Sequence, residues 1–327
     1  MKGLKGLEQK VLILTDGKAG HENQSKAFAR ALGCDFDLVE VHFKSKFHKL
    51  LSYIFDHLRI HSSFLLLATE GTQGGRKALC PLCASEALCG DKKYCNVIGT
   101  GSGTFYAAKV VAKKLGVACG VVLYPRGYDI ASFDCILAPA FDRPKRAANV
   151  VEIPANLVAN DEDFYAKGVA AFRERTSVVP EIAVIVGGPN KCSTLTPDWM
   201  KARLDEIFAL PGAKAVTTSR RTPAEVEAVV DSYPWDYRLL YSKDHFNPIP
   251  AFVKLAKRLY VTAESTGMLS EACTFGSAEV VALDNLNPGP HKFRRFVENL
   301  REAGYVDGNK KVDLAAQFSA ARRLMDL

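Results

Sequence analysis

Basic side chains that follow predicted strands are the residues of this sequence best suited to hold a phosphate group. The stretch "SRRT" places Arg220 and Arg221 after one such strand, and "GGPNK" places Lys191 after another. An arginine fits phosphate because its planar guanidinium can donate two parallel hydrogen bonds. A helix N-terminus carries only about half a positive charge, which is too little for a diphosphate. The pattern favours a nucleotide-diphosphate site, with a pair of solvated arginines as the plainer alternative.

A second set of candidates lies in "VTAESTGMLSEACTFG", where a predicted strand runs into a predicted helix. Glu264 ends the strand, and residues 265–267 can form a helix N-terminus that receives a phosphate. Glu271 follows within the helix, where its carboxylate could accept hydrogen bonds from the vicinal hydroxyls of a ribose. The alternative for Glu271 is an ordinary acid early in a helix, where the helix dipole favours it.

The stretch "LTDGKAGHENQ" carries the candidate acid–base residues. His21 is the candidate general base, because an imidazole can be neutral at physiological pH and remove a proton from an attacking hydroxyl. Asp16 is either a second candidate base or the group that orients His21. Gly17 and Gly20, on either side of Lys18, would let the chain approach donor or acceptor closely. A helix-capping histidine without a chemical role is the alternative.

Four cysteines form a weak candidate metal site, with the spacing Cys80-x2-Cys83-x5-Cys89-x5-Cys95. Such a set could bind zinc or an iron–sulfur cluster, although the spacing matches no standard site. The stretch also falls where the fold calls for a helix, in which small buried cysteines pack well. The nearest approach to a DxD metal motif, "DED" at 161–163, lies in a predicted linker. We therefore expect no metal and no cofactor.

The segment "FKSKFHKLLSYIFDHLRIH", residues 43–61, is basic and amphipathic. It could rest on an anionic membrane, and packing of the helix against the sheet is the favoured interpretation. His57 and His61 are four residues apart and could share one helix face. Two histidines so placed could bind a metal ion, but no third ligand is nearby in the sequence. We therefore favour a solvated helix face for both.

Composition excludes several classes of protein. The 327 residues are 48% hydrophobic and 24% charged, as in globular domains, and no apolar run approaches the 18 or so residues of a membrane span. The apolar run near the N-terminus is short and ends in a polar turn, so it predicts a strand rather than a signal peptide. Nine cysteines without a secretion signal predict thiols in a reducing cytosol. We expect a cytoplasmic protein, which could work at the inner face of the cytoplasmic membrane.

The formal net charge of +7 is moderate, and the basic residues form no long run. No zinc-finger, RRM or KH signature is present, so we expect no nucleic-acid partner. A positive balance fits anionic metabolites and an anionic membrane surface equally well.

Strand and helix patterns alternate along almost the whole chain, which predicts parallel sheets covered by helices on both faces. A charged, helical stretch without strand pattern, "ANDEDFYAKGVAAFRERTSVVP", marks the expected junction of two domains. We predict an N-terminal domain over 1–158, a linker helix over 159–179 and a C-terminal domain over 180–300. Helices over 301–327 could pack back on the N-terminal domain. The predicted fold is α/β, with two Rossmann-like domains facing each other across a cleft.

Several polar loops follow the predicted strands, at the edge where parallel sheets bind their ligands. They are "DGKAGH", "GTGSGT" with Gly101 and Ser102, "GGPNK", "SRRT" and "AESTG". Each loop alone could reflect the preference of turns for Gly, Ser, Thr and Asn. Five such loops, each directly after a predicted strand, favour a ligand site.

Six motifs carry a family resemblance: "LTDGKAGHENQ", "VIVGGPNK", "TTSRRTP", "NPIPAF", "VTAESTGMLSEA" and "KFRRFVENL". In this order they resemble the motifs of the elongated-mitochondria (ELM) mitochondrial fission protein family, whose bacterial members are regarded as glycosyltransferases. The resemblance spans nearly the whole chain. It implies a GT-B-like fold, in which the second domain binds most of the nucleotide-sugar and the first domain binds the acceptor.

The resemblance also implies site residues. Those that would line the donor site are Gly187, Gly188, Ser219, Arg220, Ser265, Thr266, Gly267 and Glu271, and beside the base or the sugar would lie Asn247 and Pro248. Glu264 and Ser265 keep the family's acid–serine pair, whereas "FGSAEVV" lacks the lysine and proline of the family's following turn. The "GTGSGT" loop lacks the arginines expected there. "GKAGH" resembles the Gly-Gly-x-Gly-Gly-His loop of the bacterial transferase that adds N-acetylglucosamine to a lipid-linked peptidoglycan precursor.

The leading hypothesis is a metal-independent glycosyltransferase of the hexosyltransferase class (EC 2.4). Its donor would be a nucleotide-sugar, and its acceptor would be lipid-linked or a saccharide, as in the synthesis of cell-envelope polysaccharide. One alternative is a non-catalytic recruitment protein of the mitochondrial-fission type. Another is an NAD(P)-dependent oxidoreductase, which Glu40 would suit because it lies 20 residues after Gly20. The glycine loops only approximate the dinucleotide fingerprint, which weakens this last alternative.

Overall fold

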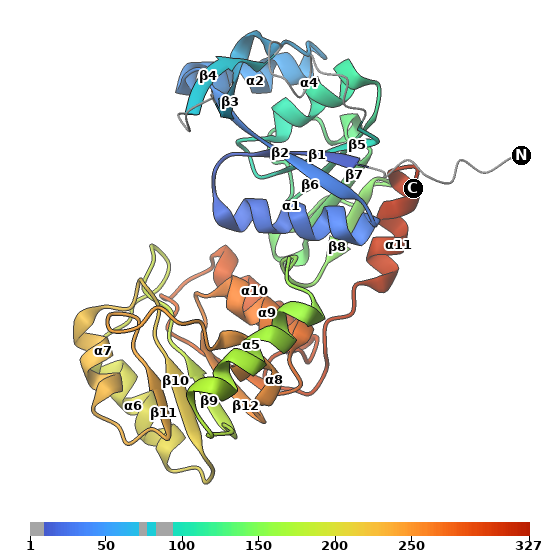
Figure 1. Cartoon of the computed structure of the whole chain (residues 1–327). Helices are drawn as coiled ribbons and strands as arrows, with labels where there is room; N and C mark the ends of the chain where they lie inside the picture. Colours follow the sequence, from blue (N-terminus) through green and yellow to red (C-terminus); the bar gives the residue numbers. More distant parts are fainter. Residues whose placement is uncertain (1–9, 72–76, 83–93) are drawn as a thin grey trace, which may run out of the picture. The chain divides into compact units, whose positions relative to one another are not determined.

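The computed structural model describes residues 10–71, 77–82 and 94–327, and the chain divides into two compact units (Figure 1). The first unit comprises Met1–Ile153 together with Leu314–Leu327, and the second comprises Pro154–Asp313. Each unit has its own sheet and its own hydrophobic core. No helix in the described part of the chain is long and apolar enough to cross a membrane.

The sheet of the first unit has eight strands in the order β4-β3-β2-β1-β5-β6-β7-β8. All neighbouring strands are parallel except β2–β3 and β3–β4, which are antiparallel. The strands are β1 (Lys10–Thr15), β2 (Asp35–Phe43), β3 (Leu66–Gly71), β4 (Lys77–Pro81), β5 (Asn96–Thr100), β6 (Ala118–Val122), β7 (Cys135–Pro139) and β8 (Val150–Ile153).

The antiparallel edge corrects the prediction for residues 77–81, which form β4 instead of part of a helix. Only five residues separate β3 from β4, whereas a parallel crossover needs a dozen or more. Two strands joined so closely can pair only in the antiparallel sense.

The helices of the first unit are α1 (Ala19–Leu32), α2 (Lys46–His57), α4 (Phe105–Leu115), α11 (Ala315–Leu324) and the 3-10 helices Ser63–Leu65, Ile130–Ser132 and Ala140–Asp142. Because the chain leaves β1 and β5 in opposite directions along the sheet, α1 and α4 cover opposite faces (Figure 1). Helix α2 packs Leu51, Tyr53 and Phe55 against the core and buries Ser52 and Asp56 on the same side of the helix. The helix thus packs on the core of the unit through these three side chains, and a second apolar side faces outward.

Helix α11 belongs to the first unit although it ends the chain. Arg322 donates a hydrogen bond to the carbonyl of Leu32 at 2.6 Å, and Asn96 donates one to the carbonyl of Met325 at 3.3 Å. Residues 301–313 lie instead in the second unit. The predicted C-terminal segment 301–327 is thus divided between the two units.

The sheet of the second unit is fully parallel, with strand order β11-β10-β9-β12-β13. Its strands are β9 (Ile182–Ile185), β10 (Lys214–Thr217), β11 (Tyr237–Leu239), β12 (Arg258–Thr262) and β13 (Glu279–Leu283). Its helices are α5 (Glu162–Arg175), α6 (Pro197–Phe208), α7 (Ala224–Asp231), α8 (Ile249–Leu255), α9 (Thr266–Phe275) and α10 (Lys292–Glu302).

The expected linker helix is α5, and it is part of the second unit. Asp161 caps its N-terminus by accepting a hydrogen bond from the backbone N–H of Phe164. A Cβ at Gly168 would lie 2.5 Å from Pro250 of α8, so the glycine lets the two helices pack closely. The buried rings of Phe172 and Phe252 add an aromatic contact between them. This packing makes α5 a structural helix of the unit rather than a free connection.

Candidate functional site

Each sheet has one point where the strand order reverses, and parallel sheets bind ligands at such points, beyond the carboxyl ends of the strands. In the first sheet the point lies between β1 and β5, and in the second it lies between β9 and β12. The loops predicted from the sequence as "DGKAGH" and "GTGSGT" follow β1 and β5, and "GGPNK" and "AESTG" follow β9 and β12. The four loops therefore meet in pairs.

Asp16 and His21 form a hydrogen-bonded pair at the first of these points. The distances from Nδ1 of His21 to the two carboxylate oxygens of Asp16 are 3.0 and 3.2 Å. Lys18 bridges the same carboxylate from its Nζ at 2.5 Å. Because an ionised carboxylate only accepts, Nδ1 carries the ring proton, and Nε2 keeps the lone pair that a general base needs. Among the described residues, none makes a hydrogen bond to Nε2 of His21.

The ionised form of Asp16 is favoured by its surroundings. Burial works to raise the pKa of this carboxyl, but the hydrogen bonds and positive charges of Lys18 and His21 outweigh it. The pKa of Asp16 consequently lies below its usual range. A charged Asp16 can hold the imidazole of His21 in one tautomer and stabilise the imidazolium that proton transfer would create.

Glycines bring the two loops of the first unit together. A Cβ at Gly101 would lie 2.4 Å from Cε1 of His21, and one at Gly103 would lie 2.8 Å from Cβ of Asp16. Gly101 and Gly17 also have positive φ angles, of 83° and 76°, which favour glycine. Around Gly20, by contrast, an added Cβ would have no atom of another described segment within 4 Å. Gly103 is a site residue that the sequence reading missed.

The remaining loop residue, Ser102, contacts a neighbouring helix. Its hydroxyl accepts a hydrogen bond at 3.0 Å from Nζ of Lys49 in α2. Ser25 of α1 and Thr100 at the end of β5 are joined at 2.6 Å between their hydroxyls. Helices α1 and α2 therefore both fix the loop that packs against the Asp16–His21 pair.

Glu264 organises the corresponding point of the second unit. Its Oε1 accepts hydrogen bonds from the N–H of Gly188 at 2.8 Å, the hydroxyl of Ser265 at 2.9 Å and the hydroxyl of Thr262 at 3.0 Å. Thr262 in turn accepts a hydrogen bond from the N–H of Gly187 at 2.8 Å. Oε2 of Glu264 is buried without a hydrogen-bond partner among the described residues. The acid–serine pair thus ties the loop after β9 to the start of α9.

No side chain larger than glycine fits at 187 and 188. A Cβ at Gly187 would lie 2.0 Å from Oε1 of Glu264, and one at Gly188 would lie 2.1 Å from the carbonyl oxygen of Arg221. The guanidinium of Arg221 donates to the carbonyl of Gly188 at 2.9 Å, and Thr222 donates to that of Gly187 at 2.6 Å. Arg221 therefore has a structural task in the loop.

Arg220 and Lys191 are exposed, and the structure gives neither side chain a partner among the described residues. They remain available to an anion. Ser219 shapes the same loop, because its hydroxyl accepts from the N–H of Arg221 at 3.3 Å and lies 3.1 Å from that of Thr222. The sequence pattern "SRRT" therefore contains one arginine that is engaged within the loop and one, Arg220, that has no partner among the described residues.

The N-terminus of α9 offers unused donors. Ser265 occupies the N-cap position of α9, but its hydroxyl donates to Glu264. Its side chain accepts no hydrogen bond from the N–H groups of the helix. The N–H groups of Thr266, Gly267 and Met268 have no acceptor among the described residues. A Cβ at Gly267 would meet no atom within 4 Å, so the space beside these amides is open. An anion there would satisfy groups that a helix otherwise leaves to water.

Glu271 is half-buried one turn further along α9. Its Oε1 accepts hydrogen bonds from the hydroxyl of Tyr165 at 2.9 Å and from Nδ2 of Asn160 at 3.2 Å. Burial raises the pKa of this carboxyl, and the two hydrogen bonds oppose that rise without cancelling it. Tyr165 lies in α5 and Asn160 lies just before it, both within the range predicted as a linker.

Asn247 is exposed and is engaged within its own turn. Its Oδ1 accepts a hydrogen bond at 3.2 Å from the N–H of Ile249, the first residue of α8. The neighbouring Pro248 is buried. The structure brings neither residue into a hydrogen bond with the other predicted donor-site side chains.

Of the four cysteines predicted as a weak metal site, the two that the structure describes lie too far apart to share one ion. Cys83 and Cys89 lie outside the described residues. Cys80 is on β4 and Cys95 precedes β5, which are four strand positions apart, or about 19 Å at the usual spacing of strands. Ligands of one ion lie within about 4 Å of each other, so Cys80 and Cys95 cannot share it. Cys95 instead lies 4.0 Å from Cys34, sulfur to sulfur.

Within the described ranges, no group of three or more His, Cys, Asp or Glu side chains is arranged to hold a metal ion. His57 is exposed at the end of α2, and His61 contacts Lys113 at 3.3 Å and the carbonyl of Arg59 at 2.9 Å. Neither histidine belongs to the candidate site.

Comparisons with known proteins agree with this fold. A family model described as "Mitochondrial fission ELM1" matches residues 19–323. The mitochondrial fission protein ELM1 of Arabidopsis thaliana is 24% identical over 371 residues, covering 93% of this chain and 85% of that protein. An uncharacterized protein of Rickettsia prowazekii (strain Madrid E) is 28% identical over 211 residues, covering 60% of this chain and 53% of the relative.

Among solved structures, the UDP-GlcNAc 2-epimerase from Neisseria meningitidis bound to UDP-GlcNAc resembles this chain with a TM-score of 0.51. The sequences are 10% identical, and the match covers 97% of this chain and 98% of that one. At this identity the likeness shows the fold alone. It confirms the predicted fold class of two Rossmann-like α/β domains with parallel sheets and covering helices.

Proposed function

The chain belongs to the mitochondrial fission ELM1 family, and from this premise and its two loop sites we propose that it is a metal-independent glycosyltransferase. It would transfer a sugar from a nucleotide-diphosphate sugar to a hydroxyl of a lipid-linked or saccharide acceptor. The observation that carries the proposal is the set of unpaired donors after β12 and β10, namely three amides at the start of α9 and the side chain of Arg220.

These donors suit a diphosphate leaving group. The amides of residues 266–268 can bind phosphate oxygens at the positive end of the α9 dipole. Arg220 and Lys191 supply the formal charge that the amides lack. As the bond to the sugar breaks, these groups would stabilise the negative charge that develops on the diphosphate. Cationic side chains in this role would make a metal ion unnecessary.

Glu271 suits the ribose of the donor. Tyr165 and Asn160 hold Oε1, whereas Oε2 accepts no hydrogen bond from a described residue. A carboxylate fixed through one oxygen can accept from ribose hydroxyls through the other. The two groups that hold Glu271 would therefore position it for the donor.

His21 suits the role of general base. Its Nε2 would take the proton from the acceptor hydroxyl as the oxygen attacks the anomeric carbon, and Asp16 would stabilise the resulting imidazolium. No cofactor enters this scheme. We place the protein in the cytoplasm, a proposal supported by the seven described cysteines, which are free thiols.

The experiment that tests the proposal is a thermal-shift screen of the full chain with UDP-, GDP-, ADP- and CMP-linked sugars and the free nucleotides. We expect at least one of them to raise the melting temperature. Arg220→Ala should weaken that ligand by at least about tenfold, because a charge-assisted phosphate contact is lost. Arg173→Ala, an exposed arginine on α5, is the matched control and should bind as the wild type does. Absence of any shift across the panel would refute the proposal.

A second candidate is a non-catalytic recruitment protein, because the Arabidopsis relative carries the name of a mitochondrial fission protein. The same fold could serve partner binding without transfer. In that case Arg220→Ala and Glu271→Ala would leave the function of the protein in cells unchanged.

A further inference from the structure

Helix α2 carries an apolar stripe that faces solvent. Phe47, Leu50, Ile54 and Leu58 follow each other at spacings of three, four and four residues, which places them on one side of the helix. Their exposed fractions are 63%, 61%, 51% and 64%. We call these four residues the α2 stripe. A surface helix of a globular protein normally turns such a side toward the core.

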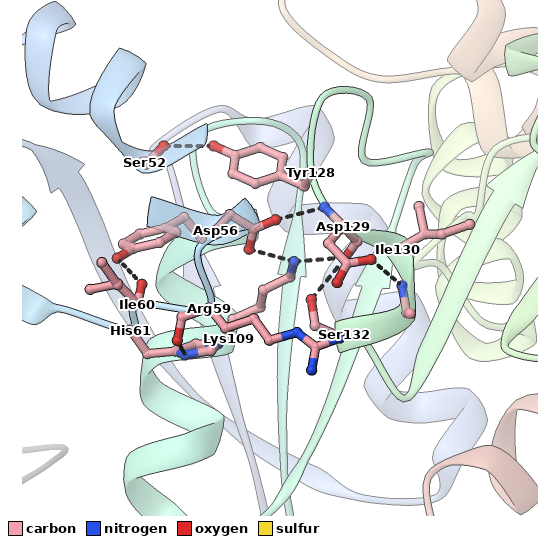
Figure 2. Close-up of polar contacts among 12 residues, drawn as sticks. Ser52, Asp56, Arg59, Ile60, His61, Lys109, Tyr128, Asp129, Ile130 and Ser132 are labelled. Carbon is pink, nitrogen blue, oxygen red and sulfur yellow. Dashed lines mark hydrogen bonds and ion pairs between the residues drawn. The ribbon is translucent and has the colours of Figure 1, made fainter. Parts of the chain in front are cut away.

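Buried polar contacts hold α2 in this orientation (Figure 2). On the side opposite the stripe, Asp56 accepts hydrogen bonds from Nζ of Lys109 at 2.6 Å and from the N–H of Asp129 at 2.6 Å. Ser52, one turn earlier, lies 3.0 Å from the hydroxyl of Tyr128. The side chains of Asp56 and Lys109 are each 1% exposed.

Rotating α2 to bury the stripe would break these contacts. Such a rotation would expose Asp56 and leave Lys109 as a buried charge without its partner, which is strongly unfavourable. Lys109 also donates to the carbonyl of Asp129 at 2.8 Å and lies 4.1 Å from the ring centroid of Phe133. The fold therefore fixes the stripe outward by specific chemistry.

The charges around the stripe are basic. Between residues 43 and 61 the sequence has Lys44, Lys46, Lys49 and Arg59, and its one acid is the buried Asp56. Phe64, which is 67% exposed, extends the apolar surface beside the helix, since its ring lies 6.1 Å from that of His48. A surface of large apolar side chains on a segment that is basic and has no exposed acid of its own is complementary to anionic lipid.

We propose that the α2 stripe docks on an anionic lipid bilayer, with its apolar side chains among the acyl chains near the headgroups and its basic residues at lipid phosphates. Lys49 connects this helix to Ser102, in the loop that packs against His21. Docking would therefore bring the candidate base close to the lipid surface, as an acceptor with a lipid anchor requires. This conclusion about the acceptor rests on the proposed function, whereas the docking itself does not.

The test is flotation of the full chain with phosphatidylcholine vesicles, with and without phosphatidylglycerol. We expect the wild type to float with the vesicles that contain phosphatidylglycerol and much less with the others. The double variant Leu50→Ser, Ile54→Ser should lower the partition coefficient by at least about tenfold. Lys44→Gln with Lys46→Gln should remove most of the preference for phosphatidylglycerol.

The matched control is Val179→Ser, which changes an exposed apolar residue of the second unit and should float as the wild type does. Because positions 50 and 54 are exposed, their variants should keep the wild-type melting temperature. Equal flotation of the stripe variant and the wild type, or no flotation of the wild type, would overturn the proposal. So would a wild-type dimer that the stripe variant dissociates, because the stripe would then bind a second copy.

Flotation is independent of nucleotide-sugar binding. Flotation without any thermal shift in the ligand screen would leave the docking intact and refute the glycosyltransferase. A thermal shift without flotation would refute the docking and leave the proposal of a glycosyltransferase intact.

Discussion

At the scale of single residues, the pairing of Asp16 and His21 has a direct kinetic consequence. His21→Ala should lower the turnover of sugar transfer by about 10²–10⁴-fold, because the general base is lost. It should leave the affinity for nucleotide-sugar within about twofold, since the proposed donor groups lie in the second unit. Turnover and donor affinity measured on the same preparation check this.

Asp16→Asn tests the role of Asp16 as an orienting group. An asparagine can present its amide to Nδ1 and so favour the wrong tautomer of the imidazole. We expect a loss of turnover approaching that of His21→Ala. Turnover close to that of the wild type in His21→Ala would remove His21 from the role of base, and the same result in Asp16→Asn would remove Asp16 from the orienting role.

Glu271 gives a prediction about pH. Burial raises the pKa of Glu271 in the folded protein, so the folded state binds this proton more tightly than the unfolded chain does. The resulting stabilisation is present below the ordinary carboxyl value and is lost as the pH rises through the raised folded value. Glu271→Gln cannot ionise, so it does not lose stability as the pH rises, and its side-chain oxygen should keep both hydrogen bonds that Oε1 accepts. The variant should therefore be more stable than the wild type at neutral pH.

The measurement is the midpoint of urea unfolding for Glu271→Gln and the wild type, without ligand, at neutral pH and near pH 4. The advantage of the variant should shrink at the lower pH. Glu174→Gln, an exposed acid on α5, is the control and should show no such trend. An advantage for Glu271→Gln that is independent of pH would contradict the effect of burial.

At the scale of elements, the Asp56–Lys109 pair joins α2 to α4 in the first unit. Lys109→Met should lower the free energy of unfolding by about 3–5 kcal/mol, because it leaves Asp56 buried without its ion partner. Lys113→Met, an exposed lysine on the same helix, should change it by less than about 0.5 kcal/mol. Equilibrium unfolding by urea compares the two.

The double variant Asp56→Leu, Lys109→Met removes both charges, so it shows how much of the loss in Lys109→Met comes from leaving Asp56 as an unpaired buried charge. Since both charges are then absent, its stability should lie closer to the wild type than that of Lys109→Met. Equal losses in the single and the double variant would show that the pair contributes through shape rather than charge.

Local sequence patterns predicted most of the elements that carry the candidate site. Strand–loop–helix patterns located β1, β9 and β12 and the loops after them, because buried parallel strands are apolar runs that end in turn residues. The orientation of α2 could not be predicted in this way. Its apolar residues lie on two sides of the helix, and the buried partner of Asp56 lies 53 residues further along the chain.

The sequence also could not assign each arginine of "SRRT". Both have the same chemistry, and only the position of the Gly188 carbonyl shows that Arg221 is engaged within the protein. Tyr165 and Asn160 were missed for a similar reason, since their link to Glu271 spans more than 100 residues. Contacts between segments distant in sequence leave no local pattern.

At the scale of the whole molecule, the chain consists of two α/β units, and the strand order of each sheet reverses once, at the kind of point where parallel sheets bind ligands. The first unit holds the Asp16–His21 pair, and the second holds the unpaired amides at the start of α9 that we propose as donors to a diphosphate. The chain returns at its end to the first unit through α11. Sugar transfer would require the residues of both units.

The most direct measurement of this function is the release of nucleoside diphosphate from the nucleotide-sugar identified in the screen, in the presence of a lipid extract as the source of acceptor. We expect the wild type to release it with or without EDTA, and His21→Ala to release it about 10²–10⁴-fold more slowly. No release by the folded wild-type protein, with any nucleotide-sugar that it binds, would contradict a glycosyltransferase.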